Sequence, residues 1–248
     1  MRKNWRTTGT VIAACFSGIN RIIFTWDINE AHAGDFIMPV DAIIPFRPVN
    51  PKTRLSDIMD QQEREAFARI MLGDVICTLR EAGCNPCILC TKEYHHPGAR
   101  TCIDGQGLNE ALNDYLSRCR QGPVLIFMSD IPLATAEGVR RVITTDADIA
   151  IVPGRGGGTN VIFIRDPSRF RVDFYGASFC DHMAIAHAAG LSTEVIDSFF
   201  MSTDIDERED LVEILLHAKG ESRGFLQGIG IDISLETGRV SVQRSPHE

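Results

Sequence analysis

The sequence lacks the features that mark several common classes of protein. No apolar run approaches the length of a membrane-spanning helix, and no internal repeat, linker or low-complexity segment is present. Basic residues are few, since 25 Lys and Arg stand against 33 Asp and Glu and give a formal net charge of -8. Because a long nucleic acid needs a basic surface, these absences argue against a nucleic-acid polymer or a membrane as partner. A nucleotide is still allowed, because it needs only a local cationic pocket.

Both glycine-rich phosphate-binding motifs, GxxxxGK[ST] and GxGxxG, are also missing. Residues 40–56, VDAIIPFRPVNPKTRLS, instead run from a short apolar segment into a loop with three prolines, no glycine and the basic residues Arg47, Lys52 and Arg54. Lys52 and Arg54 are two positions apart in a proline-stiffened loop, so both can project toward one ligand. Side-chain cations would then hold a phosphate. The alternative is a solvated basic loop.

The eight cysteines include the segment CNPCILC, in which Cys84, Cys87 and Cys90 have a spacing like that of an iron–sulfur site. The fourth ferredoxin-type ligand would fall at Tyr94. The segment also has the composition of a buried strand, where Cys87 would point away from the other two cysteines. We interpret the three as small buried apolar residues and expect free thiols in a reducing cytoplasm. A metal-cluster redox protein is the alternative.

Strand-like runs alternate along the chain with amphipathic helices. We predict strands at 42–46, 87–90, 123–130, 147–152 and 161–164 and one leading into Met201, and helices at 61–81, 108–118, 136–143, 178–189 and 207–218. Asp60 and Glu63 predict a capping box at the first helix. The alternation predicts an α/β fold with an open, mostly parallel sheet and helices on both faces, whose ligands bind beyond the carboxyl ends of the strands. The tail GIDISLETGRVSVQR predicts a C-terminal β-hairpin turning at Thr237-Gly238.

Residues 1–37 differ in character from the domain predicted at 38–248. A basic start, MRKNWR, precedes the apolar TVIAACFSGI, and Ala31-His32-Ala33 resembles a signal-peptide cleavage site. Asn20-Arg21 interrupts the apolar run, and Met38 stands two residues before Val40, where the segment that contains the first predicted strand begins. We therefore interpret residues 1–37 as a dispensable N-terminal extension with Met38 as the original start. An export signal is the alternative.

Three aspartates follow strand-like segments. Asp130 ends the very apolar PVLIFMSD, and Asp204 and Asp206 lie two apart in STDIDERED, so an extended backbone places both on one face. Like charges on one face repel unless a cation lies between them. The three carboxylates therefore predict an Mg²⁺ site. The alternative is that Asp206, with Glu209, caps the final helix.

A glycine-rich segment, PGRGGGTN at 153–160, connects two predicted strands. Its consecutive glycines, including Gly157 and Gly158, allow backbone N–H groups to face an anion, and Thr159 adds a hydroxyl group. Ser178, in YGASF, opens the next helix, where it could cap the helix or donate to the same anion. A flexible hairpin turn is the alternative.

The motifs KTRLS, MSDIPL, PGRGGGTN, YGASF and STDIDEREDL, in this order and spacing, resemble archaeal 2-phospho-L-lactate guanylyltransferase from Met38 to the C-terminus. The resemblance implies a fold like that of nucleotide-diphospho-sugar transferases. It also implies a Mg²⁺-dependent reaction in coenzyme F-420 biosynthesis, in which GTP and 2-phospho-L-lactate give lactyl-2-diphospho-5′-guanosine and pyrophosphate. The alternatives are phosphoenolpyruvate, 3-phosphoglycerate or a sugar phosphate as acceptor, and a non-catalytic GTP-binding module.

The resemblance also implies roles for individual residues and partners. Lys52, Arg54 and Asp130 would be catalytic; Lys52, Arg54 and Asn109 (in GLNEAL) would contact the nucleotide; Gly157, Gly158, Thr159 and Ser178 would bind the acceptor; and Asp130, Asp204 and Asp206 would hold Mg²⁺. A homodimer is a further expectation. The labile product is expected to pass to a downstream 2-phospho-L-lactate transferase.

Overall fold

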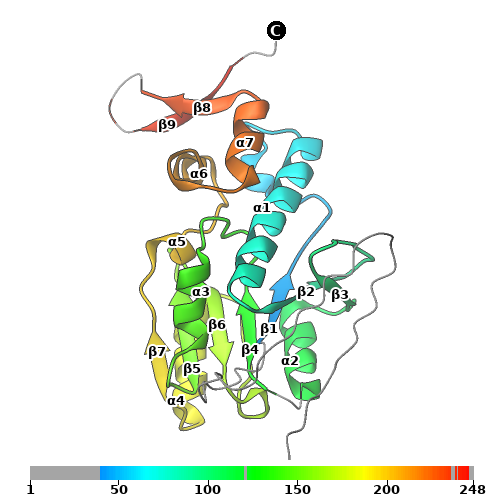
Figure 1. Cartoon of the computed structure of the whole chain (residues 1–248), viewed down its shortest axis with the longest axis vertical. Coiled ribbons are helices and arrows are strands. Elements are labelled where there is room, and N and C mark those ends of the chain that lie inside the picture. Colours follow the sequence, from blue (N-terminus) through cyan, green and yellow to red (C-terminus); the bar gives the residue numbers. More distant parts are fainter. Residues whose placement is uncertain (1–39, 120–121, 236–237, 239, 246–248) are drawn as a thin grey trace, which may run out of the picture. The chain divides into compact units, whose positions relative to one another are not determined.

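A seven-stranded sheet forms the centre of the chain in the computed structural model, which describes residues 40–119, 122–235, 238 and 240–245 (Figure 1). Its strand order is β3-β2-β1-β4-β6-β5-β7, and β6 is the one strand antiparallel to its neighbours. The strands are β1 (Asp41–Pro45), β2 (Asn85–Cys90), β3 (Arg100–Ile103), β4 (Val124–Phe127), β5 (Ile149–Pro153), β6 (Thr159–Ile164) and β7 (Thr193–Val195). The predicted open, mostly parallel sheet is confirmed.

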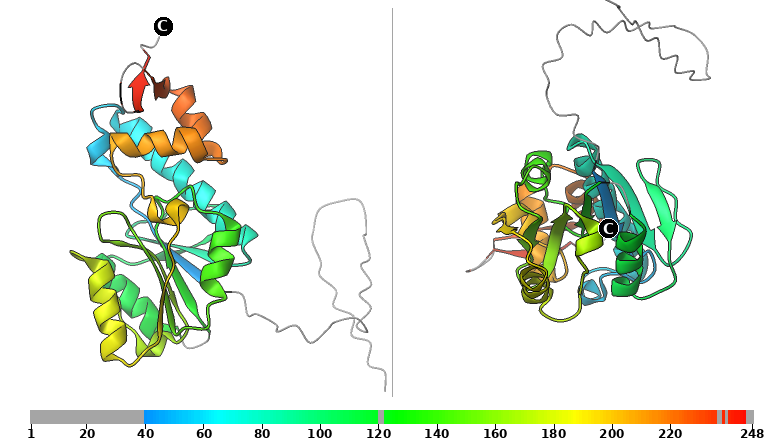
Figure 2. Two further views of the ribbon diagram at one scale, coloured as in Figure 1. Left: turned by 90° about the vertical axis from the view of Figure 1, so that its left-hand side faces the viewer. Right: turned by 90° about the horizontal axis from the view of Figure 1, so that it is seen from below.

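Helices cover both faces of this sheet (Figure 2). They are α1 (Gln61–Glu81), α2 (Leu108–Arg118), α3 (Ala136–Ile143), α4 (Ser178–Ala188), α5 (Phe199–Ser202), α6 (Leu211–His217) and α7 (Glu221–Gly228). Helices α1 and α3 share one hydrophobic core, and α2 and α4 share another on the opposite face. Successive side chains of β1 divide between the two cores, Ile44 with the first and Ile43 with the second, as the pleat of a strand requires.

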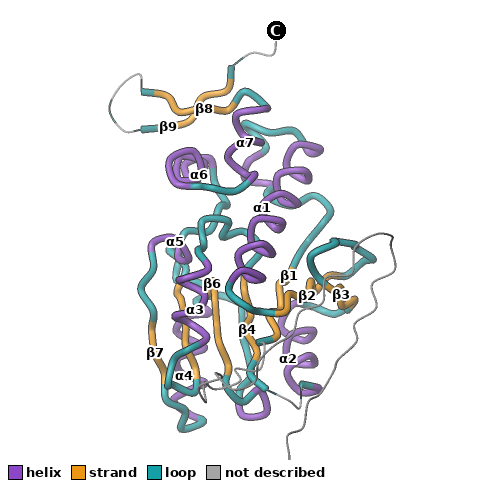
Figure 3. Tube along the Cα trace, in the orientation of Figure 1, coloured by secondary structure: helices purple, strands orange, loops and turns teal. Residues whose placement is uncertain are grey.

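Beyond the sheet lie α6, α7 and the antiparallel pair β8 (Ile231–Ser234) and β9 (Ser241–Arg244), next to one end of α1 (Figure 3). These elements form a third core with Phe67 and Met71 of α1. The Asp74 carboxylate accepts the N–H groups of Glu221 at 2.8 Å and Ser222 at 3.0 Å and so caps α7. Because β8 and β9 pair antiparallel, the predicted C-terminal hairpin is confirmed. Thr237, where its turn was predicted, lies outside the described residues.

The predicted helices agree closely with the structure, whereas three short elements differ. The Asp60–Glu63 capping box is present. The exposed four-residue edge strand β3 and helix α7 were not predicted. The predicted strand into Met201 is wrong: β7 ends earlier, and the Ser198 hydroxyl accepts the Met201 N–H and begins helix α5.

The cysteines of CNPCILC divide between the two faces of the sheet as predicted. Cys84 and Cys90 belong to the core under α1, whereas Cys87 belongs to the opposite core and lies 2.8 Å (Sγ to Sγ) from Cys102. Within the described residues, no three side chains of Cys, His, Asp or Glu are grouped as metal ligands. This geometry argues against a cluster built on CNPCILC.

Residues 1–37, predicted to be a dispensable extension, and Met38 lie outside the described residues. Within the part of the chain that the structure describes, no helix is both long and apolar enough to cross a bilayer.

Candidate functional site

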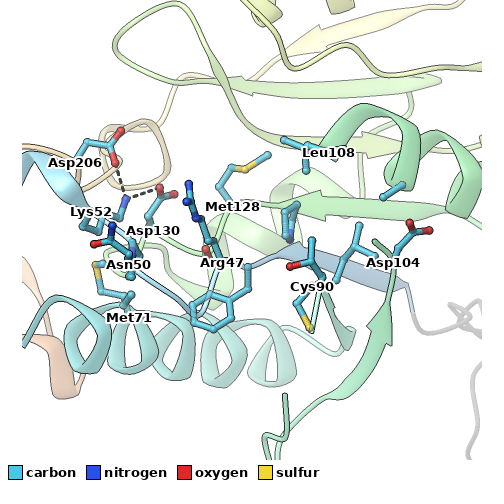
Figure 4. A pocket seen from close by; sticks show the side chains of 18 of the residues that line it. Arg47, Asn50, Lys52, Met71, Cys90, Asp104, Leu108, Met128, Asp130 and Asp206 are labelled. Carbon is cyan, nitrogen blue, oxygen red and sulfur yellow. Dashed lines mark hydrogen bonds and ion pairs between the residues drawn. The ribbon is translucent and has the colours of Figure 1, made fainter. Parts of the chain in front are cut away.

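The carboxyl ends of β2, β1 and β4, with the segment after β3, open into a cavity of about 600 Å³ (Figure 4). This is the edge at which ligands bind in open α/β sheets, and the volume suits a small-molecule ligand. In Figure 4 the side chains of Lys52, Asp130 and Asp206 lie at one end of the view and that of Asp104 lies at the other. Arg47 projects between them.

The charged end of the cavity is built around the Lys52 ammonium group. Its Nζ donates to Asp130 Oδ2 at 2.7 Å and to Asp206 Oδ1 at 2.6 Å, and the side chain is only 10% exposed. Burial lowers the pKa of Lys52, but the negative charges of Asp130 and Asp206 outweigh this effect and raise the pKa above its usual value. Lys52 is therefore a fixed cation at neutral pH.

The loop after β1 holds Lys52 in an unusual backbone conformation. Lys52 (φ 51°) and Asn50 (φ 46°) both occupy the left-handed region, which costs a non-glycine residue on the order of 1–3 kcal/mol. The buried Arg64 of α1 stabilises this loop by donating to Asn50 Oδ1 at 3.0 Å and to the Met59 carbonyl at 2.9 Å, with a longer bond of 3.4 Å to the Pro51 carbonyl. Asn50 N–H also donates to Glu65 at 3.1 Å. The sequence interpretation overlooked Arg64, although its position three residues before Phe67 on the apolar face of α1 was a signal.

The segment after α5 brings the other two aspartates to Asp130. The Ile205 N–H donates to the Asp130 carbonyl oxygen at 3.0 Å, and the Ile205 side chain is fully buried. Asp204 and Asp206 flank this anchor. Burial raises the pKa of Asp204, and the charges of Asp130 and Asp206 raise it further, although a hydrogen bond from Asn160 at 3.3 Å opposes them. The three carboxylates thus share one electrostatic environment.

The interpretation of Asp206 as a helix cap is wrong. Glu207 occupies the cap position before Arg208–Asp210, and Asp210 completes a capping box, because its Oδ2 accepts the N–H groups of Glu207 at 2.8 Å and Asp206 at 3.0 Å. The Asp206 side chain is therefore available to the cavity. Arg54 lies at its outer side, 67% exposed, with Nη1 3.7 Å from Asp206 Oδ2 and 3.7 Å from Glu207 Oε1. Both predicted cations, Lys52 and Arg54, therefore approach the same carboxylate.

The glycine-rich segment forms a hairpin turn between β5 and β6. The Gly154 N–H donates to the Gly158 carbonyl at 2.9 Å and the Gly157 N–H to the Gly154 carbonyl at 3.2 Å, and Gly157 has a φ of 84° that favours glycine. The Phe179 N–H donates to the Gly157 carbonyl at 3.2 Å and ties the turn to the start of α4. The backbone therefore forms the hairpin turn that was the alternative interpretation. The Phe179 bond places Gly157 and Gly158 beside the first turn of α4.

Thr159 and Ser178, both predicted to bind the acceptor, are buried close to this turn but do not line the cavity that contains Lys52. Ser178 does not cap α4, because Ala177 occupies the cap position and no side chain bonds there. Thr159 Oγ1 lies 2.9 Å from Nδ1 of the fully buried His182, whose Nε2 accepts the Asp173 N–H at 3.0 Å. This pattern assigns the ring proton to Nδ1, which donates to Thr159.

Asn109, predicted to contact the nucleotide, is 9% exposed and has hydrogen bonds at both ends of its amide. Its Nδ2 donates to Asp173 Oδ1 at 2.8 Å, and its Oδ1 accepts the Phe174 N–H at 2.7 Å. Asn109 therefore links α2 to the segment that holds His182. It does not line the cavity, whereas its neighbour Leu108 does.

The polar residues that line the cavity but were not predicted as site residues include Arg47, Asp104 and Gln106. Arg47 was visible as a third base in the first loop. Asp104 and Gln106 follow the unpredicted strand β3, so nothing in the sequence interpretation placed them at the carboxyl edge of the sheet.

Comparison with known proteins supports the resemblance seen in the five motifs. The family described as "Guanylyl transferase CofC like" matches residues 40–245. The 2-phospho-L-lactate guanylyltransferase of Methanoculleus marisnigri is 57% identical over 209 residues, 84% of this chain and 97% of that protein. Its counterpart in Methanoregula boonei is 53% identical over 203 residues, 82% of this chain and 94% of that protein.

The fold is similar to that of a solved structure, a putative nucleotide-diphospho-sugar transferase from Desulfovibrio desulfuricans G20. The two align with a TM-score of 0.64 and 18% identity, over 77% of this chain and 95% of that one. At this identity the likeness concerns the fold alone, and it agrees with the predicted fold class.

The buried His182 predicts a specific pH dependence of stability. Burial lowers the pKa of His182 from 6.5 to about 4, despite the nearby Asp173 charge. Above pH 6.5 both folded and unfolded chains hold a neutral imidazole, whereas at lower pH the unfolded chain binds a proton that the folded chain does not. We therefore expect this residue to reduce the free energy of unfolding by up to about 3 kcal/mol between pH 6.5 and pH 4.

Urea unfolding of wild type and His182→Gln at pH 7 and pH 5 measures this effect. The variant should lose less stability than wild type on acidification. His187→Gln, on the exposed side of the same helix, is the matched control and should follow wild type. Equal losses in wild type and His182→Gln would show that the imidazole does not titrate as expected.

Proposed function

Because the chain belongs to the guanylyl transferase CofC-like family, whose curated relatives are nucleotidyltransferases, we propose that it joins GTP to 2-phospho-L-lactate. The products would be lactyl-2-diphospho-5′-guanosine and pyrophosphate, in coenzyme F-420 biosynthesis. The observation that carries this proposal is the buried Lys52 ammonium, held between Asp130 and Asp206 at one end of a nucleotide-sized cavity. Such a site suits a polyanionic ligand and a cation together.

The donor chemistry at this end of the cavity fits Mg²⁺. Asp130 and Asp206 line the cavity, and Asp204 lies near them without lining it; their carboxylate oxygens are the ligands that Mg²⁺ prefers. The Lys52 ammonium already bridges Asp130 and Asp206 as a cation. The described residues are not yet arranged as a three-ligand group, and Lys52 occupies the space between two of the three. We propose that these aspartates hold Mg²⁺ when nucleotide is bound. The ion would supply positive charge that offsets the repulsion between the two phosphorylated substrates.

The chain's own residues would act mainly through charge and position. An acceptor phosphate has a second pKa of about 6, so at neutral pH it is mostly a dianion and needs no general base to attack the α-phosphorus. One phosphorus–oxygen bond forms to the acceptor, and the bond to the departing pyrophosphate breaks. Lys52 and Arg54 would stabilise the negative charge on that pyrophosphate. No covalent enzyme intermediate is needed.

The acceptor is proposed to lie near the hairpin turn of Gly157 and Gly158, where Thr159 and Ser178 are buried beside the start of α4. His182 supports this placement, because its Nδ1–H donates to Thr159 and thereby directs the Thr159 hydroxyl proton elsewhere. Since Thr159 and Ser178 do not line the nucleotide-sized cavity, the acceptor would occupy a neighbouring position.

Three further expectations belong to this proposal. The free cysteines among the described residues fit a reducing cytoplasm as the place of the reaction. The labile diphosphate product would be passed to a downstream 2-phospho-L-lactate transferase, and the enzyme would act as a homodimer. Sedimentation of the purified protein and of its mixture with that transferase measures both associations.

Pyrophosphate release tests the substrates directly. GTP, ATP, CTP and UTP would each be combined with 2-phospho-L-lactate, phosphoenolpyruvate and 3-phosphoglycerate in the presence of Mg²⁺. We expect the highest kcat/KM for GTP with 2-phospho-L-lactate and loss of activity on chelation of the metal. A higher value with phosphoenolpyruvate would change the acceptor, and GTP binding without any pyrophosphate release would contradict the proposed reaction.

The exchange Asp130→Asn should abolish pyrophosphate release while the fold stays intact, because it removes one charge from the proposed metal site. Turnover and thermal unfolding of the variant are the measurements. Asp146→Asn, an exposed aspartate outside the cavity, is the control and should retain activity. Turnover of Asp130→Asn close to that of wild type would remove Asp130 from the metal site.

The exchange Lys52→Ala should weaken GTP binding, since it removes the cation nearest to the phosphates and leaves Asp130 and Asp206 facing each other. Loss of a charge-assisted contact predicts at least a tenfold rise in the dissociation constant for GTP, roughly 1.5–3 kcal/mol. Titration calorimetry measures it, with the exposed Lys219→Ala as control. Unchanged GTP affinity would count against a role for Lys52.

A further inference from the structure

We propose that Asp104 recognises the guanine base, through the N1–H and 2-amino groups of its Watson–Crick edge. The inference rests on the proposed use of GTP. It starts from the position of Asp104 at the end of the cavity opposite to Lys52, Asp130 and Asp206 (Figure 4).

The strand order fixes the length of the cavity. Asp104 follows β3 directly, Asp130 lies three residues after β4, and β3, β2, β1 and β4 are adjacent and parallel. Neighbouring strands lie about 4.8 Å apart, so the edge from β3 to β4 covers roughly 14 Å. This span is comparable to the length of a nucleoside triphosphate. With the phosphates at Lys52, the base reaches the region of Asp104.

Hydrogen bonds to β2 and within its own segment hold Asp104 in place. The Asp104 N–H donates to the Cys90 carbonyl at 3.0 Å, and Oδ1 accepts the Gln106 N–H at 2.9 Å. Gln106 Nε2 lies 3.5 Å from Oδ2 and donates to Asp114 at 3.0 Å. Within the described residues, no Lys, Arg or His forms an ion pair with Asp104. The carboxylate therefore retains acceptor capacity for a ligand in the cavity.

The chemistry of this end favours guanine over the other bases. Guanine presents two adjacent donors, N1–H and the 2-amino group, which match the two oxygens of a carboxylate. Adenine presents an unprotonated N1 at that edge, which a carboxylate repels. Leu89, Leu108 and Ala111 line the cavity and supply apolar surface for the base. A phosphate group is disfavoured beside Asp104, because both are negatively charged.

Asp104→Asn tests the proposal, because this exchange should shift the nucleotide preference from GTP toward XTP. The asparagine amide can still accept from N1–H, but its NH₂ group opposes the 2-amino group of guanine and donates to the 2-oxo group of xanthine. We expect the Kd for XTP divided by the Kd for GTP to fall at least about tenfold in Asp104→Asn. XTP should also bind more tightly to the variant than to wild type. Titration calorimetry without acceptor measures each nucleotide, and the ratio for 2′-deoxy-GTP against GTP should not change.

Glu110→Gln is the matched control, because Glu110 is an exposed acid on α2 that does not line the cavity. It should bind all three nucleotides as wild type does. A changed 2′-deoxy-GTP ratio with an unchanged XTP ratio would assign Asp104 to the ribose and overturn the proposal. Equal weakening of every nucleotide, or no preference of wild type for GTP over XTP, would overturn it as well. Wild type that binds GTP selectively but releases no pyrophosphate would contradict the proposed reaction and leave the base assignment standing.

Discussion

A single buried ammonium group links three segments that are far apart in the chain. Lys52 follows β1, Asp130 follows β4, and Asp206 comes from the segment after α5, so their ion pairs hold three loops together. An unpaired charge in this position would cost several kcal/mol, because burial removes its hydration. Two further features bring these three side chains together. Arg64 supports the left-handed loop that carries Lys52, and the Ile205 N–H donates to the Asp130 carbonyl next to Asp206.

The order of the strands turns this convergence into a binding site. β1 lies between β2 and β4, so the chain leaves β1 in one direction and later returns on its other side. A crevice forms at such a switch in parallel sheets, because the adjoining connections lie on opposite faces. Here it carries positive and negative groups at one end and the Asp104 carboxylate at the other, with Arg47 and apolar side chains between them. This polarity suits a ligand with a charged tail and a flat, donor-bearing head.

Local sequence signals predicted the large elements well and the small ones poorly. Helix α1 has apolar residues at helical spacing over most of its length and begins with a capping box, and β4 is a continuous apolar run. Both were therefore predicted from nearby residues. β3 has four residues on an exposed edge, and α5 has four residues begun by the Ser198 hydroxyl. α7 receives its cap from Asp74 of a distant helix. Such elements depend on contacts that lie outside their own sequence window.

The sequence alone determined the fold class, the alternation of elements, the division of Cys84, Cys87 and Cys90 between two faces, and the family. The fold class and the strand faces follow from the spacing of apolar residues along the chain, and the family follows from five motifs in a specific order. Only the tertiary structure decided that the Lys52 ammonium lies between Asp130 and Asp206, that Asn109 is engaged in internal hydrogen bonds, and that Asp104 reaches the cavity. The physical reason is that a side chain's partners depend on which strands are neighbours in the sheet, and that order is set by packing of the whole core.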